Sequence, residues 1–194
     1  MTTRPELLSP DFRGLSARLG QDPLQVQGPG GNTSIKGDGV MWIKASGTEL
    51  ADAESRDIFV AVDHDAALAE ARGEAGDGSC KTTVLDPAVM LRPSIETTFH
   101  AGLGRAVVVH THSVATLVHA ISPTGRQVAR DKLSGLAFEM VPYAKPGLPL
   151  TREILALATP QTEVFVLQNH GLIVCGDTVG DVSRMIAEVE RRLA

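Results

Sequence analysis

The segment Val107-Val108-Val109-His110-Thr111-His112 combines three consecutive β-branched residues with a His-x-His pair. A β-branched run of this kind is typical of a buried strand. Alternate side chains of a strand point to the same face, with Cα atoms about 6.6 Å apart, so His110 and His112 can bind one ion together. Imidazole is a common ligand of zinc and similar divalent ions. The segment therefore predicts either a strand that ends in two metal ligands or a pair of structural histidines.

The composition is that of a globular domain without an extended basic surface. The chain has 194 residues, of which 43% are hydrophobic, and a net charge of −5. A chain of this length can bury one sizeable core, so we expect a single domain over residues 1–194. The negative charge and the lack of a clustered basic patch argue against nucleic acid or an anionic membrane surface as a partner.

Targeting signals and cysteine usage indicate where the protein resides. No segment approaches the roughly 18 consecutive apolar residues of a membrane span, and residues 1–20 lack the apolar core of a signal peptide. The two cysteines, Cys80 and Cys175, are far apart and have no CxxC spacing. Such cysteines fit a reducing compartment better than a disulfide framework. We therefore expect a cytoplasmic protein that does not associate with membranes.

Predicted strands and helices are interleaved along the chain, which favours a layered α/β or α+β domain. Strands are expected at residues 33–35, 40–43, 58–62, 107–112, 138–141, 164–167 and 171–175. Helices are expected at residues 10–18, 66–72, 95–101, 114–121, 151–158 and 179–193. Asp38-Gly39 predicts a hairpin turn, and Ser94 and Thr178 are candidate N-caps of the helices that follow them. Residues 73–81 are expected to form a mobile loop.

A zinc site needs at least one ligand beyond the His-x-His pair. His170 is the best candidate, because it follows the apolar strand expected at residues 164–167, and site residues are often displayed where strands end. The competitors are His64, His100 and His119. We expect His119 to be a packing or surface residue on the helix after the His-x-His strand, and His64 to be solvated in its charged segment.

Glu96 is the carboxylate best placed for proton transfer. It opens a predicted helix directly after Pro93-Ser94, and His100 lies four residues later on the same helical face. To act as a base, Glu96 must face the metal pocket; the alternative is an ordinary acid in the first turn of a helix. The residues 28–32 either cradle a phosphate with backbone amides or form a hairpin-entry turn. Ser46-Gly47 allows the same two interpretations.

Several short motifs occur together in one order along the chain. These motifs are Gly30-Gly31-Asn32-Thr33-Ser34, Lys44-Ala45-Ser46-Gly47, Arg92-Pro93-Ser94-Ile95-Glu96, His110-Thr111-His112 and Asn169-His170-Gly171. In order and rough spacing they resemble the class II aldolase/adducin family, which includes L-fuculose-phosphate aldolase and L-ribulose-5-phosphate 4-epimerase. The motifs cover most of the chain, from about residue 10 to its end.

The resemblance implies a fold, an assembly and a set of site residues. The fold is a three-layer α/β/α sandwich with a central, largely antiparallel mixed sheet, and the assembly is a homotetramer with sites at subunit interfaces. By matching position, the zinc ligands would be His110, His112 and His170, with Mn²⁺, Co²⁺ or Fe²⁺ as alternatives to Zn²⁺. Glu96 would be the acid/base residue. The substrate and phosphate would bind Gly31, Asn32, Ser46, Gly47 and Ser94.

The activity implied by the resemblance is metal-dependent aldol cleavage of a ketose phosphate or related hydroxy-carbonyl compound through an enediolate. An epimerase or dehydratase of a sugar phosphate on the same scaffold is the alternative within the family, and a non-catalytic adducin-like binding protein is the alternative outside enzymes. Ile95 departs from the serine that sugar-phosphate aldolases typically carry before the glutamate, which removes a hydroxyl donor for phosphate. Tyr143 is the sole tyrosine and could reach a neighbouring subunit's site.

Overall fold

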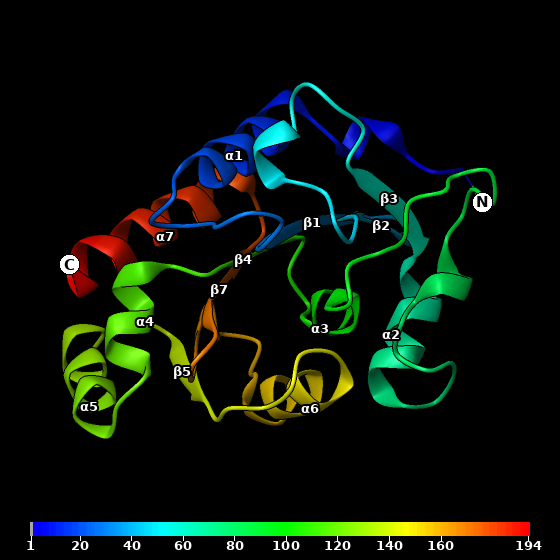
Figure 1. Ribbon diagram of the computed structural model, residues 1–194. Helices are drawn as coiled ribbons and strands as arrows, with labels where there is room; N and C mark the ends of the chain where they lie inside the picture. Colours follow the sequence, from blue (N-terminus) through cyan, green and yellow to red (C-terminus); the bar gives the residue numbers. More distant parts are fainter. Residues whose placement is uncertain (1) are drawn as a thin grey trace.

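A computed structural model describes residues 2–194, and a seven-stranded mixed sheet runs through its centre with helices on both faces (Figure 1). The strands are β1 (Asn32–Gly37), β2 (Val40–Lys44), β3 (Phe59–Asp63), β4 (Val107–Thr111), β5 (Phe138–Val141), β6 (Val164–Leu167) and β7 (Gly171–Gly176). The α-helices are α1 (Pro10–Gln21), α2 (His64–Arg72), α3 (Thr97–Gly102), α4 (Val114–Ala120), α5 (Pro123–Lys132), α6 (Leu148–Leu157) and α7 (Val179–Leu193). Three short 3₁₀ helices are η1 (Pro5–Leu7), η2 (Leu50–Asp52) and η3 (Lys81–Thr83).

The strand order β3-β2-β1-β4-β7-β6-β5 places the His-x-His strand β4 at the centre of the sheet. Every neighbouring pair of these strands is antiparallel except β5 and β6, which are parallel. On one side of β4, Asn32 pairs with His110; on the other side, Leu172 pairs with Thr111. The expected largely antiparallel mixed sheet is thus confirmed, and its register brings the start of β1 and the start of β7 against the end of β4.

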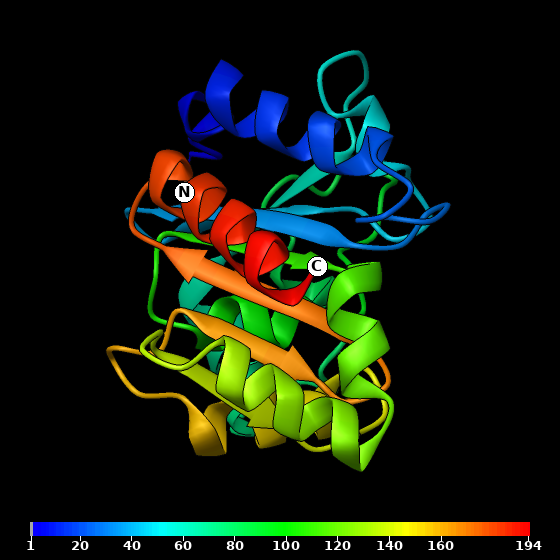
Figure 2. The ribbon, with the colours of Figure 1, turned by 90° about the vertical axis from the view of Figure 1, so that its left-hand side faces the viewer.

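The two faces of the sheet are covered by different helices, which confirms the three-layer α/β/α architecture. Helices α1, α4, α5 and α7 contribute to the core on one face, and Figure 2 shows α5 and α7 in front of the strands. Helices α2, α3 and α6 cover the other face. Side chains of β4 alternate between them, with Val107 and Val109 in the first core and Val108 in the second, against Phe99. No helix within residues 2–194 is long and apolar enough to cross a membrane.

The helix expected at residues 95–101 begins two residues later, at Thr97, and Glu96 rather than Ser94 occupies the cap position. A tight turn precedes the helix, because the Thr97 amide donates to the Ser94 carbonyl at 3.1 Å. The Ser94 hydroxyl accepts from the Glu96 amide at 3.2 Å. The turn buries Glu96, whose exposed fraction is 5%, so Glu96 is not the ordinary solvent-facing acid of a first helical turn.

Two further features differ from the sequence-based expectations, and a third adds a detail to the expected loop. Helix α5 (Pro123–Lys132) was not predicted, because its only buried residue is Ala129 and it therefore lacks an apolar stripe. His64 is half-buried rather than solvated, with Nε2 within 3.0 Å of the Ala101 carbonyl. The loop at residues 73–81 is anchored to α2 by the buried Glu70 carboxylate, which accepts from the amides of Gly78 at 2.9 Å and Cys80 at 3.1 Å.

Candidate metal centre

Three histidines from two places in the sheet converge at one point. His110 is the fourth residue of β4, His112 lies just beyond its end, and His170 lies in the turn between β6 and β7. Each ring offers one nitrogen, and the three nitrogens lie within 4.8 Å of one another. The ring centroids are 4.8 Å apart for His110 and His170 and 5.1 Å apart for His110 and His112. The structure therefore brings together the three residues predicted as metal ligands.

Backbone geometry in the β6–β7 turn explains how His170 reaches β4. Asn169 has a φ of 56°, in the left-handed region that asparagine adopts more readily than most residues, and Gly171 has a φ of 153°, which favours glycine because glycine has no Cβ. A Cβ on Gly171 would lie 2.2 Å from the Thr111 carbonyl oxygen. Only glycine allows β7 to start this close to β4, so the Asn-His-Gly sequence places the imidazole between the two strands.

The glycines before β1 make room for the same imidazoles. A Cβ on Gly30 would lie 2.9 Å from Nδ1 of His112, and one on Gly31 would lie 3.0 Å from the His110 carbonyl oxygen. Gly31 also has a φ of 61°. Close packing on the histidines is therefore one reason for this glycine cluster. Binding of a phosphate by Gly31 stays a prediction.

His110 and Glu96 face each other in a way that calls for a cation between them. The His110 Nδ1 lies 3.0 Å from the Leu172 carbonyl oxygen, which can only accept, so the ring proton sits on Nδ1. The Nε2 lone pair then points toward the Glu96 carboxylate, with Nε2 and Oε2 3.5 Å apart. The Nε2 atom of His170 lies 3.5 Å from Glu96 Oε1. The buried His110 Nε2 and Glu96 Oε1 have no hydrogen-bond partner within the described chain. These facing acceptors fit a divalent metal ion.

Burial keeps the three imidazoles neutral at physiological pH. It lowers the pKa of His110 to about 3, with the neighbouring His112 acting in the same direction. It lowers the pKa of His170 to about 4, and the charge of His110 acts in the same direction while Glu96 opposes it. The pKa of His112 is also lowered by burial. Because metal ligation requires the unprotonated ring, the site is prepared for an ion at pH 7.

A chain of buried side chains holds Glu96 in place. The Asn32 amide donates to Glu96 Oε2 at 2.9 Å and to the Ser94 hydroxyl at 3.2 Å. The side-chain oxygen of Asn32, Oδ1, accepts from Nε2 of His100. The Nδ1 atom of His100 lies 2.7 Å from the Ser34 hydroxyl. Asn32 can contact both because β1 pairs with β4 beside α3, which begins directly after Glu96 and contains His100. His100 is thus a structural neighbour of the carboxylate rather than a metal ligand, and sequence spacing alone did not reveal this network.

The residues predicted to bind substrate line one pocket of about 370 Å³ in front of the histidines. Its lining includes every predicted binding residue, namely Gly31, Asn32, Ser46, Gly47 and Ser94. Lys44 also lines the pocket, is 3% exposed and donates to the Pro29 carbonyl at 2.9 Å. Burial lowers the pKa of Lys44 to about 8, and the negative charge of Glu96 opposes the shift. The sequence signal that could have identified Lys44 as a site residue is its position at the end of an apolar strand.

Comparison with known proteins now assigns the family. A sequence model of the "Class II Aldolase and Adducin N-terminal domain" matches residues 16–194. The chain belongs to the class II aldolase and adducin family. The N-terminal class II aldolase domain of a conserved protein from Thermoplasma acidophilum superposes with a TM-score of 0.82 at 27% identity, over 94% of this chain and 90% of that one. The L-fuculose-1-phosphate aldolase from Thermus thermophilus shares the fold, with a TM-score of 0.66 at 15% identity over 96% of this chain and 90% of that one.

Curated relatives of this class II aldolase family member carry different names. The uncharacterized oxidoreductase YuxG of Bacillus subtilis (strain 168) is 31% identical over 178 residues, in a match that covers 82% of this chain and 25% of YuxG. A 3-oxo-tetronate 4-phosphate decarboxylase of Escherichia coli (strain K12) is 30% identical over 111 residues, in a match that covers 51% of this chain and 52% of that enzyme. The chain thus matches a quarter of one relative and about half of the other.

Of the remaining candidate residues of this class II aldolase domain, His119 and Tyr143 do not line the pocket, whereas Ile95 does. His119 on α4 has Nε2 within 2.9 Å of the Leu193 carbonyl, which agrees with the expected packing role. Tyr143 is 61% exposed and is not among the residues that line the pocket. Ile95 lines the pocket and is 61% exposed. Its apolar side chain therefore forms part of the pocket surface.

Proposed function

We propose that this protein is a metal-dependent aldolase that cleaves a ketose phosphate or a related hydroxy-carbonyl compound into a three-carbon ketone fragment and an aldehyde. The observation that carries the proposal is the meeting of His110, His112 and His170 with the buried Glu96 carboxylate, and three of these four residues line one pocket. The three imidazoles would hold Zn²⁺ or another divalent ion such as Mn²⁺, Co²⁺ or Fe²⁺. When bound, the ion would polarise the substrate carbonyl and stabilise the charge of an enediolate.

The chain's own residues would position the substrate and move its proton. Glu96 is the proposed acid/base residue, because its Oε1 is buried without a partner in the described structure while Asn32 fixes Oε2. We propose that Oε1 exchanges a proton with the carbon of the ketone fragment at which the carbon–carbon bond breaks. The near-complete burial of Glu96 excludes bulk water from that transfer.

We also propose that Gly31, Asn32, Ser46, Gly47 and Ser94 bind the substrate, since all five line the pocket. Ile95 bears on whether that substrate carries a phosphate. An isoleucine offers no donor, so a phosphate here would depend on Ser94, Asn32 and main-chain amides. Activity on unphosphorylated ketoses only would identify the Ile95 surface as a contact for an apolar or uncharged part of the substrate.

A retro-aldol screen tests the proposal directly. Purified protein is offered pentulose and hexulose phosphates and their unphosphorylated forms, with and without a chelator, and aldehyde release is measured. We expect cleavage of at least one substrate, its loss with chelator, and its loss in Glu96→Gln with metal content unchanged. Removal of one ligand in His110→Ala should abolish both metal binding and turnover. Activity that survives the chelator and Glu96→Gln would refute the mechanism.

A decarboxylase is the second candidate, favoured by the 30% identity to the 3-oxo-tetronate 4-phosphate decarboxylase. Loss of CO₂ from a 3-oxo acid leaves its bonding electrons on the adjacent carbon, so the same charge-stabilising pocket would serve. The aldolase and decarboxylase hypotheses differ in their products. A 3-oxo sugar acid phosphate that releases CO₂ without releasing an aldehyde would replace the aldolase assignment. An epimerase or dehydratase would release neither product.

The domain organisation, the location and the oligomeric state of the protein are also proposed. We propose a single domain over residues 1–194, a cytoplasmic location consistent with the free cysteines Cys80 and Cys175, and a homotetramer. Val118 and Ile121, around the end of α4, are 60% and 61% exposed, and an assembly would cover such side chains. Sedimentation equilibrium should give about four times the 20.5 kDa mass of one chain; a monomer would contradict the tetramer.

A further inference from the structure

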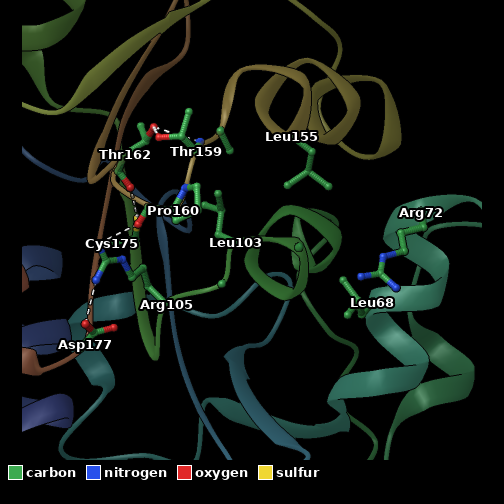
Figure 3. Close-up of a pocket in the computed structure, with 13 residues that line it drawn as sticks. Leu68, Arg72, Leu103, Arg105, Leu155, Thr159, Pro160, Thr162, Cys175 and Asp177 are labelled. Atoms are coloured by element: carbon green, nitrogen blue, oxygen red, sulfur yellow. Dashed lines mark hydrogen bonds and ion pairs between the residues drawn. The ribbon is translucent and has the colours of Figure 1, made fainter.

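A second cavity lies at the opposite end of β4 from the metal centre. Its volume is about 520 Å³, and Figure 3 shows the residues around it. Arg105 on its wall precedes β4, whereas His110 lies near the far end of that strand. Five residues of extended chain span about 17 Å, so the cavity and the metal centre are separate sites. None of the residues that line this cavity lines the pocket in front of the histidines.

One side of the cavity is apolar. Leu68 from α2, Leu103 after α3 and Leu155 from α6 project toward it in Figure 3. Leu155 packs tightly on α3, because a Cβ on Gly102 would lie 2.7 Å from Leu155 Cδ1. Leu68 and Leu155 are half-buried and offer an aliphatic surface to a ligand, with the buried Leu103 beside them.

The charged groups of the cavity are unequally paired. Arg105 donates to Asp177 at 2.7 Å and to the Pro160 carbonyl at 3.0 Å, so its charge is balanced and its position is fixed. Arg72, on the opposite wall, points its guanidinium into the cavity in Figure 3. Arg72 makes no hydrogen bond or ion pair with any side chain that the structure describes. Arg72 is an exposed residue, and its positive charge, which has no ion pair among the described residues, borders the aliphatic surface.

The loop that carries Leu103 and Arg105 presents a further donor. Lys36 Nζ donates to the Leu103 carbonyl at 2.6 Å and to the Arg105 carbonyl at 2.7 Å. In a trans peptide the N–H points away from the preceding carbonyl, so the Gly104 N–H is directed away from Lys36. Gly104 lines the cavity, and its amide has no acceptor within residues 2–194.

We propose that this cavity binds an aliphatic monocarboxylate, with the carboxylate at Arg72 and the Gly104 amide and the hydrocarbon chain on the three leucines. A guanidinium and a backbone amide are suitable partners for a carboxylate. The volume lies within the range of small-molecule sites, which is about 300–1,000 Å³. Because Arg105 is already paired with Asp177, one guanidinium of the cavity is free to bind an anion, and a single guanidinium suits a monoanion better than a dianion such as phosphate.

Titration of the purified 194-residue protein with hexanoate, followed by calorimetry and by saturation-transfer NMR, tests the proposal. Arg72→Gln should weaken hexanoate binding by about tenfold or more, the usual effect of losing a hydrogen bond to a charged group. Arg72→Lys should restore part of the affinity, since it restores the charge. Arg130→Gln removes an exposed arginine of α5, outside the cavity, and should leave binding unchanged. Hexanamide should bind more weakly than hexanoate.

Several results would overturn the proposal. These are the absence of hexanoate binding, equal binding by wild type and Arg72→Gln, or equal loss in Arg72→Gln and Arg130→Gln. Circular dichroism of each variant shows that it is folded, and Arg72→Lys provides a second test at the same position. Because binding is measured directly and on metal-free protein, the result does not depend on the proposed aldolase activity.

Discussion

At the scale of single residues, Glu96 depends on Asn32 for its orientation, and Asn32 depends on His100. Neither contact follows from sequence spacing, because each needs the register of β1 against β4 and the start of α3. The period of two along β4 did predict that His110 and His112 share a face. His170 and Glu96 were placed by the resemblance and by the strand end, and the structure brings both to the same point.

We predict that Ser34→Ala lowers turnover while leaving metal content unchanged. Ser34 is fully buried, does not line the substrate pocket, and contacts His100 at 2.7 Å. Without the Ser34 hydroxyl the His100 ring can change its orientation. The Asn32 side chain, which contacts His100 and donates to Glu96, can then move as well. A shift of about 1 Å in a catalytic group can cost 10²-fold in rate. The measurements are kcat, KM and metal content by elemental analysis.

Asn32→Ala serves as the comparison, since it removes the contact to Glu96 itself. We expect a larger loss of kcat there than in Ser34→Ala, again with metal bound. A rise in KM alone, with kcat intact in both variants, would show that the network binds substrate and does not position the carboxylate.

Metal-free protein should lose stability as the pH falls below about 6.5. Burial lowers the native pKa of His110 to about 3 and that of His170 to about 4, from an ordinary value of 6.5. Between pH 6.5 and 4 the unfolded chain therefore binds protons that the native chain does not. The free energy of unfolding must then decrease as the pH decreases. Urea titrations at several pH values in this window measure the slope.

The matched control is His170→Asn, which removes one of these imidazoles. Its free energy of unfolding should fall less steeply with decreasing pH than that of the wild type. Identical slopes for the two proteins would contradict a neutral, buried His170.

At the scale of elements, the turn between β6 and β7 sets the third histidine against β4. We predict that Gly171→Ala destabilises the protein by about 1–3 kcal/mol, the cost of a strained backbone position, and weakens metal binding. The reason is the 2.2 Å approach that its Cβ would make to the Thr111 carbonyl. Gly104→Ala is the control, because its Cβ would meet nothing within 4 Å. Urea denaturation and metal titration of both variants provide the measurement; equal effects would contradict the steric argument.

Elements with a clear apolar period were predictable, and elements or element ends without one were not. The apolar stripe with Thr178 as cap predicted α7, whose cap hydroxyl accepts from the Asp181 amide. Helix α5 has a start signal at Ser122-Pro123, but it buries only Ala129. It therefore has no apolar stripe from which the sequence could predict a helix. The start of α3 was misplaced because the turn at Ser94 competes with the helix for the same backbone groups.

At the scale of the whole molecule, the core on one face of the sheet joins the two ends of the chain. Phe12 and Leu15 of α1 belong to the same cluster as Val182 and Val189 of α7. We therefore predict a single cooperative unfolding transition, in support of the proposed single domain. Fluorescence of Trp42 and far-UV circular dichroism should give the same urea midpoint. Separate midpoints would contradict the single domain.

Because burial makes the imidazoles neutral, deprotonation of the ring accompanies folding and not metal binding. In mildly acidic solution an ordinary imidazole carries a second ring proton, whereas His110, with its pKa lowered to about 3, does not. The folded protein therefore carries no proton on Nε2 of His110, and an ion that binds this nitrogen does not displace one. Metal binding in mild acid should then release no proton from His110, and calorimetric enthalpies measured in buffers of different ionisation enthalpy report how many protons the site releases in total.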